Sequence, residues 1–116
     1  MTFLKKENRV YVTNAAGHDF EPAKQYGIFM PLTKGNINPT HTDRITLDML
    51  EVLKDSSPDD YLLLSGHPVT VLIATSIMFT LHGKIKFLVW NKHTSDYSIR
   101  EISKKQIKET LSINFE

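Results

Sequence analysis

Cysteine is absent from this chain of 116 residues, and its absence removes several chemistries at once. Disulfide bonds, catalytic thiolates and cysteine-based zinc sites are all excluded, which fits a reducing compartment. The first nine residues contain no apolar signal-peptide core. The longest apolar run, residues 69–81, is too short to span a bilayer and is interrupted by hydroxyl side chains. We therefore expect a soluble cytoplasmic protein with no membrane partner.

An excess of charge of one sign is also lacking. The 14 Lys and Arg residues against 13 Asp and Glu residues give a formal net charge of +1. A protein that coats nucleic acid normally carries a larger basic excess, so we expect no long nucleic acid as a partner. Neither GxGxxG nor GxxxxGK[ST] is present, which argues against dinucleotide binding of the usual Rossmann kind and against Walker-type NTPase activity.

What the chain does contain is a succession of apolar runs separated by turn residues, within a length that suits one domain over residues 1–116. The pattern predicts strands at 9–13, 28–33, 60–65, 84–90 and 97–102, and helices at 19–26, 43–54, 68–82 and 104–112. Pro31 places the second strand at a sheet edge, and the unbroken apolar run at 61–64 indicates a central strand. Right-handed crossovers then favour an α/β fold: a three-layer Rossmann-like, mostly parallel sheet of order 2-1-3-4-5, with strand five antiparallel.

Helix boundaries follow from capping residues. Asp19 and Thr42 are the expected N-caps of the first two helices, and Gly83 should end the third. Ile45, Met49, Leu50, Val52 and Leu53 should form the buried face of the second helix. Ser103 and Gln106 form a capping box, and Ile107 and Leu111 should anchor the last helix to the core.

Three polar segments, residues 13–19, 33–36 and 65–68, follow the first three strands. Because the carboxyl ends of parallel strands share one edge of a sheet, these segments should meet in a cleft at the switch point between strands one and three. We expect this cleft to bind a phosphate-containing small molecule, a nucleotide or a nucleotide-derived signal. The expected ligand-binding residues are Thr13, Asn14, Lys34, Asn36, Ser65, Gly66, His67 and Thr70.

Each part of the cleft has an expected role. Backbone amides from Gly66 to Thr70, at the positive end of a helix, would hold phosphate. Lys34 would neutralise its charge, and Asn14 would read a base or a sugar. The alternative for the turn at 65–68 is that its side chains only satisfy backbone groups.

The same cleft also suits an enzyme, such as a phosphodiesterase or a phosphotransfer catalyst. His18 or His67 would act as acid or base, and Ser65 as nucleophile. The sequence leaves open whether catalysis occurs, and it specifies no cofactor. His41 and Asp43 could join the two histidines around a metal ion, but no metal-binding spacing is present and we assign no metal.

A third possibility is a non-catalytic interaction module whose helix at 68–82 docks a partner. Residues 69–81 are apolar almost all round, so this helix is either buried under the sheet and the last helix or pairs with its own copy. We favour a homodimer, because symmetric dimers are the commonest oligomers. Trp90 could cover a ligand or a partner, although core or edge packing explains it more simply.

Two resemblances follow from these residues. With Val-Thr-Asn ending strand one and Leu-Ser-Gly ending strand three, the plan is similar in outline to CARF-type domains, which bind cyclic oligonucleotides as dimers. That likeness implies a ligand at the strand ends, beside a two-fold axis. The runs at 12–19, 34–36 and 55–61 resemble short uncharacterised bacteriophage proteins. A phage origin would place the protein in the host cytoplasm.

Overall fold

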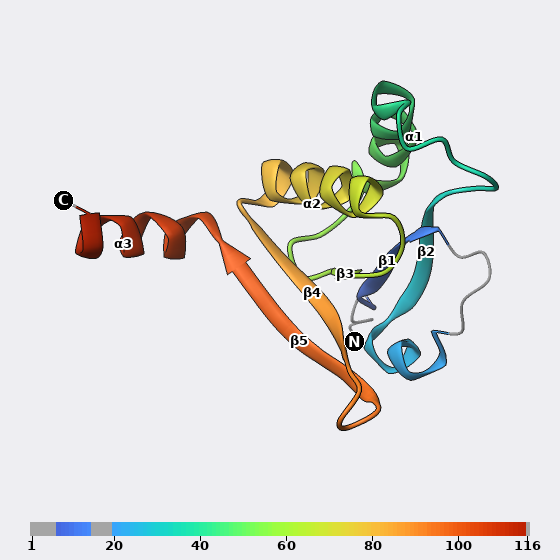
Figure 1. Ribbon diagram of the computed structural model, residues 1–116. Helices are drawn as coiled ribbons and strands as arrows, with labels where there is room; N and C mark the ends of the chain where they lie inside the picture. The colour runs from blue at the N-terminus through green and yellow to red at the C-terminus, as the bar shows by residue number, and fades with distance from the viewer. Residues whose placement is uncertain (1–6, 15–19, 116) are drawn as a thin grey trace, which may run out of the picture.

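A five-stranded mixed sheet forms the centre of the computed structural model, which describes residues 7–14 and 20–115 (Figure 1). The strands are β1 (Arg9–Asn14), β2 (Ile28–Thr33), β3 (Tyr61–Leu63), β4 (Lys84–Asn91) and β5 (Asp96–Ser103). Their spatial order is β2-β1-β3-β4-β5; the first four are parallel, and β5 runs antiparallel to β4. The predicted fold class, strand order and direction of strand five are confirmed.

The position of each strand follows from its side chains. β1 lies between β2 and β3, and its residues Val10 to Thr13 are buried. Pro31, which cannot donate to a neighbouring strand, lies exposed on the edge strand β2, as predicted. β3 is only three residues long, yet Leu62 and Leu63 are both buried because β3 is central and covered on both faces.

Helices cover the two faces of the sheet unequally. The helices that cover it are the 3-10 helix η1 (Glu21–Tyr26) and the α-helices α1 (Thr42–Leu53) and α2 (Pro68–His82). A further helix, α3 (Lys104–Phe115), follows β5. α1 and α2 lie on one face and the short η1 lies on the other, so the third layer is thin (Figure 1). The core under α1 and α2 contains Tyr11, Leu32, Ile45, Met49, Leu53, Leu62, Ala74, Ile77, Met78 and Ile85. The core beside η1 contains Val10, Val12, Phe20, Ala23, Leu63 and Leu88.

Two helix starts differ from the prediction. The residue that precedes η1 is Phe20, which forms no side-chain cap, and Asp19 lies outside the described residues. α1 starts one residue earlier than expected, so His41 takes the N-cap position and Thr42 lies inside the helix. The buried stripe of α1 is Ile45, Met49 and Leu53, spaced four residues apart. Leu50 is exposed because it lies one helical step, about 100°, away from that stripe.

The last two helices differ most from expectation. α2 packs against α1 and the sheet and ends at Gly83, whose φ of 69° is left-handed, but Leu72 and Leu81 stay exposed. α3 does not cover them: it extends away from the sheet, and all its residues are exposed (Figure 1). The expectation that Ile107 and Leu111 anchor α3 in the core is therefore wrong, although Ser103 Oγ does accept the predicted capping bond from Gln106 N–H, at 3.1 Å. Among the described residues, no helix is long and apolar enough to cross a bilayer.

Candidate ligand site

A cavity of about 270 Å³ opens where β1 and β3 end, between the β2–α1 loop and the start of α2. We call it the loop-edge cleft. It is lined by Thr13, Asn14, Gly35, Asn36, Ile37, Pro39, Gly66, His67 and Thr70. Six of the eight residues predicted to bind ligand are therefore brought together, from three segments far apart in the sequence. Lys34 and Ser65 are not among the lining residues.

Threonine hydroxyl groups hold the wall of the cleft together. Thr13, which is buried, donates from Oγ1 to the carbonyl oxygen of Ser65 over 2.8 Å. Thr33, at the end of β2, donates to the carbonyl oxygen of Thr13 through a short hydrogen bond. Thr70 donates to the carbonyl oxygen of His67 over 2.7 Å. These bonds join the ends of β1 and β2 to the β3–α2 turn. The three hydroxyl groups therefore donate to backbone carbonyl oxygens.

His67 caps α2 with its own ring. Its Nδ1 accepts a hydrogen bond from Val69 N–H over 3.1 Å, and its backbone is extended, as is usual at an N-cap. In the neutral ring, a proton-free Nδ1 means that Nε2 carries the hydrogen and can donate it. Pro68 has no N–H and the Val69 N–H is already used, so two of the backbone positions expected to hold phosphate have no amide to offer.

Close packing shapes the β1 side of the cleft. Asn14 Nδ2 donates to the carbonyl oxygen of Gly35 over 2.8 Å, which ties the end of β1 to the β2–α1 loop. Gly66 has a φ of 107°, and a Cβ atom there would lie 2.4 Å from Thr13 Oγ1. Only glycine fits such a position. The loop residues Ile37 and Pro39 complete the wall. They were not predicted from the sequence, where they only follow the polar segment 33–36.

No Lys, Arg, Asp or Glu is among the described residues that line the cleft. Lys34 is exposed just beyond β2. The amino end of α2 therefore supplies positive potential at the wall, and the His67 ring can add an N–H donor. His18 lies outside the described residues. Within residues 7–14 and 20–115, no group of three or more His, Asp or Glu residues could hold a metal ion.

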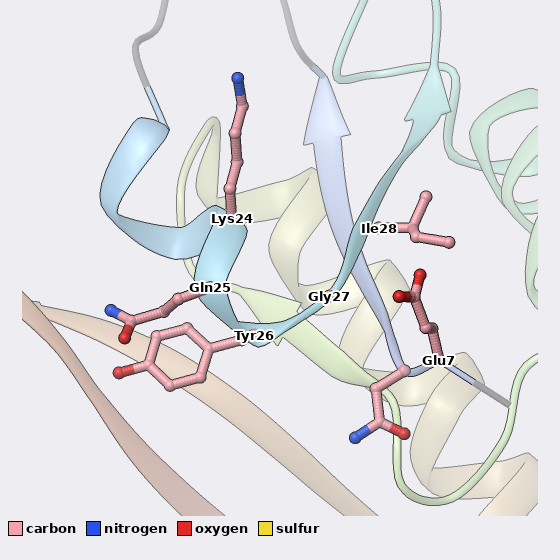
Figure 2. Close-up of a pocket in the computed structure, with 7 residues that line it drawn as sticks. Glu7, Lys24, Gln25, Tyr26, Gly27 and Ile28 are labelled. Atoms are coloured by element: carbon pink, nitrogen blue, oxygen red, sulfur yellow. The ribbon is translucent and has the colours of Figure 1, made fainter. Parts of the chain in front are cut away.

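A larger cavity, of about 640 Å³, lies at the opposite edge of the sheet, where β1 and β2 begin. Figure 2 shows that its side chains diverge: Lys24 points away from Gln25 and Tyr26, and Ile28 and Glu7 lie on the other side of β2. Tyr26 donates its hydroxyl to the carbonyl oxygen of Tyr97 over 3.2 Å. Because these groups do not converge, we prefer the smaller loop-edge cleft as the ligand site.

The same amino-terminal edge contains a buried polar cluster that was not predicted from the sequence. Asp60 is buried, and its two oxygens accept hydrogen bonds from Arg9 N–H at 2.9 Å and from Ser57 N–H at 2.8 Å. Burial raises the pKa of the nearby Tyr11 phenol. Both groups are inaccessible to a ligand, so we assign this cluster to stability.

Comparison with protein-family models gives a match over most of the chain. The family model for the phage Pam3 gp32-like protein matches residues 5–104, which run through β5 to the first residue of α3. No curated protein matches the chain, and no solved structure does. The resemblance to phage proteins is thereby supported, whereas these comparisons show no similarity to CARF-type domains.

Proposed function

We propose that this chain, which belongs to the phage Pam3 gp32-like protein family, binds a phosphate-containing small molecule in the loop-edge cleft. We further propose that this molecule is a nucleotide or a nucleotide-derived signal. The supporting observation is the convergence of three polar segments on one cavity at the switch point of the sheet, between β1 and β3. In open α/β sheets, ligands bind in the crevice at such switch points.

The chemistry of the wall suits a ligand with an anionic end and a hydrogen-bonding end. Phosphate would lie at the amino end of α2, where the helix dipole favours negative charge and His67 Nε2–H can donate. Lys34, exposed at the end of β2, would screen the remaining charge from the rim. Asn14 and Asn36 would hydrogen-bond the base or the sugar through their amide groups.

Cavity size limits the ligand. A volume of about 270 Å³ lies just below the range of about 300–1,000 Å³ that is usual for small-molecule pockets. A mononucleotide-sized group suits this space better than an extended dinucleotide, which agrees with the absence of a dinucleotide-binding motif.

The hydrogen bond that His67 Nδ1 already accepts from Val69 N–H supports binding rather than catalysis. A neutral ring whose Nδ1 already accepts from Val69 has its hydrogen on Nε2, so it offers a donor and not a base. Ser65 is not a lining residue and is linked to the cleft through its carbonyl oxygen, which accepts from Thr13. Both groups fit the support of a bound molecule better than a nucleophile–base pair.

The test is a titration followed by amide resonances of the ¹⁵N-labelled protein, with AMP, adenosine and sodium phosphate as separate probes. We expect AMP to shift resonances of cleft residues such as Asn14 and Gly66 at lower concentration than either fragment does. Shifts confined to the β4–β5 hairpin, or no shifts at all, would refute the proposal.

A matched pair of variants sharpens this test. His67→Asn keeps an N-cap acceptor for α2 but removes the imidazole donor, so the fold should survive while AMP binding weakens by about tenfold, the value of one charge-assisted hydrogen bond. His93→Asn changes an exposed histidine in the β4–β5 hairpin and should leave the AMP affinity unchanged. Equal affinities for both variants would remove His67 from the proposed site.

A further inference from the structure

Helix α3 is the part of the molecule that the fold leaves unexplained. Hydrogen bonds fix its first turn: Ser103 caps it, and Lys104 N–H donates to the carbonyl oxygen of Gly83 over 2.8 Å. It then extends away from the sheet, with all twelve residues exposed (Figure 1). A twelve-residue helix without tertiary packing is only marginally stable in water. Its stability therefore requires something to cover it.

One face of α3 is apolar and continues onto the sheet. Ile107, Leu111 and Phe115 recur every four residues and are 45%, 51% and 78% exposed. With Ile102 on β5 they line a groove of about 390 Å³, which Gln106 and Thr110 complete. Burying such a stripe is what normally stabilises an amphipathic helix.

The surface area of the chain is larger than that of a compact monomer of the same mass. The chain exposes 7993 Å², whereas a compact monomer of 13.3 kDa exposes about 6,500 Å². This surplus of about 1,500 Å² belongs to the whole chain and is consistent with a helix α3 that extends away from the sheet, whereas a standard interface buries roughly 800 Å² on each partner. The radius of gyration, 15.4 Å against about 13.4 Å for a compact chain of this length, agrees.

Charge along α3 indicates which partner fits, and in which direction. Lys104, Lys105 and Lys108 lie in its first half, where they oppose the positive end of the helix's own dipole. A second α3 packed antiparallel would place its negative carbonyl end beside these lysines. A parallel helix would place like charges together. Antiparallel pairing of identical helices is also closed by a two-fold axis, which gives a dimer and no longer chain.

We propose that a second copy of this chain covers the groove, with the two α3 helices packed antiparallel about a two-fold axis near Leu111. This interface differs from the pairing of residues 69–81 that the sequence suggested. It lies on a helix that begins where the family match ends, and it is independent of the proposed ligand site.

The test measures mass by sedimentation equilibrium over a range of protein concentrations. The native chain should approach twice its 13.3 kDa mass as concentration rises. Leu111→Glu places a charge in the centre of the stripe and should weaken dimerisation by about a hundredfold. Ile113→Glu, on the opposite face of the same helix and 82% exposed, is the matched control and should leave the dimer intact.

A second measurement uses the absence of cysteine from the chain. Leu111→Cys should form a disulfide-linked dimer rapidly under mild oxidation, whereas Ile113→Cys should not. A native chain that stays monomeric at every concentration would overturn the proposal. So would a dimer that survives Leu111→Glu, which would move the interface elsewhere. A monomer that binds anionic phosphatidylglycerol vesicles through α3 would assign the stripe to a lipid surface and would equally overturn it.

Discussion

The two edges of the sheet use polar groups in opposite ways. At the amino-terminal edge, the buried carboxylate of Asp60 has both oxygens occupied by backbone N–H groups of Arg9 and Ser57. At the carboxyl-terminal edge, the loop-edge cleft combines threonine hydroxyls that bind carbonyls with amide and imidazole groups that border an open cavity.

This contrast separates polar groups that stabilise the fold from those that can act on a ligand. A buried carboxylate that accepts hydrogen bonds from the backbone is out of reach of another molecule, and removing it leaves its donors unsatisfied. Polar groups around a cavity can exchange water for ligand. Burial and the strength of hydrogen bonding alone would select Asp60, whereas convergence and access select the cleft.

The largest expected loss of stability comes from a substitution at the amino-terminal edge of the sheet. Asp60→Ala should lower the free energy of unfolding by about 4 kcal/mol, because it removes a buried carboxylate and leaves two partly buried N–H groups without an acceptor. Asp59→Ala is the matched control: Asp59 is exposed and forms only long ion pairs with Lys84 and Lys86, so its loss should cost under about 1 kcal/mol. Urea unfolding measures both, and similar costs would contradict the assignment of Asp60.

The next largest loss of stability is expected from a substitution at the carboxyl-terminal edge of the sheet. Gly66→Ala should cost about 3 kcal/mol, because a left-handed φ of 107° disfavours a side chain and the new Cβ would press on Thr13 Oγ1. Gly83→Ala is the control, because its φ is also positive but no atom lies within 4 Å of the added Cβ; it should cost about 1 kcal/mol. Thermal unfolding compares the two variants. If Gly66→Ala costs no more than Gly83→Ala, then Thr13 does not close this side of the cleft.

The smallest expected effect is a change in how the stability of the amino-terminal edge depends on pH. Burial raises the pKa of Tyr11, so the folded chain holds the phenol proton more tightly than the unfolded chain does. This contribution to stability is fully present below the ordinary tyrosine pKa of about 10 and is lost as pH rises through the raised pKa.

Tyr11→Phe should therefore make the alkaline loss of stability shallower. Urea unfolding between about pH 8 and about pH 11 measures the slope. At neutral pH the substitution should cost about 1 kcal/mol, because the hydroxyl loses its interaction with the Asp60 carboxylate as well as the long hydrogen bond from Arg9 Nη1, at 3.5 Å. An unchanged slope would mean that Tyr11 does not titrate differently in the folded and unfolded chains.

Local chemistry made much of the fold predictable. Pro31 has no N–H to donate to a neighbouring strand, so it predicted that its strand lies at the edge of the sheet. The unbroken apolar run at 61–64 predicted a central strand. Those two residue patterns, with the right-handed crossover rule, were enough to give the strand order. The same order indicated that Asn14 and His67 share a cavity although 53 positions separate them.

Other features depended on contacts that no local pattern records. The sequence places Asp60 at the start of a predicted strand, and its role appears only where Arg9 and Ser57 approach it. Lys34 follows β2 as predicted, yet it does not line the cleft, because the loop turns Gly35 and Asn36 inward instead. His67 was expected as a ligand contact and serves first as a helix cap.

The sequence by itself determined the elements, their order and the edge of the sheet where a ligand site should lie, because apolar periodicity and turn residues act over a few neighbouring positions. Tertiary structure alone decided how far α3 extends from the sheet. The stripe of Ile107, Leu111 and Phe115 indicates only that a helix has an apolar face. Whether that face packs against the core of the chain depends on the direction in which β5 ends. Here α3 extends away from the sheet and packs against no core.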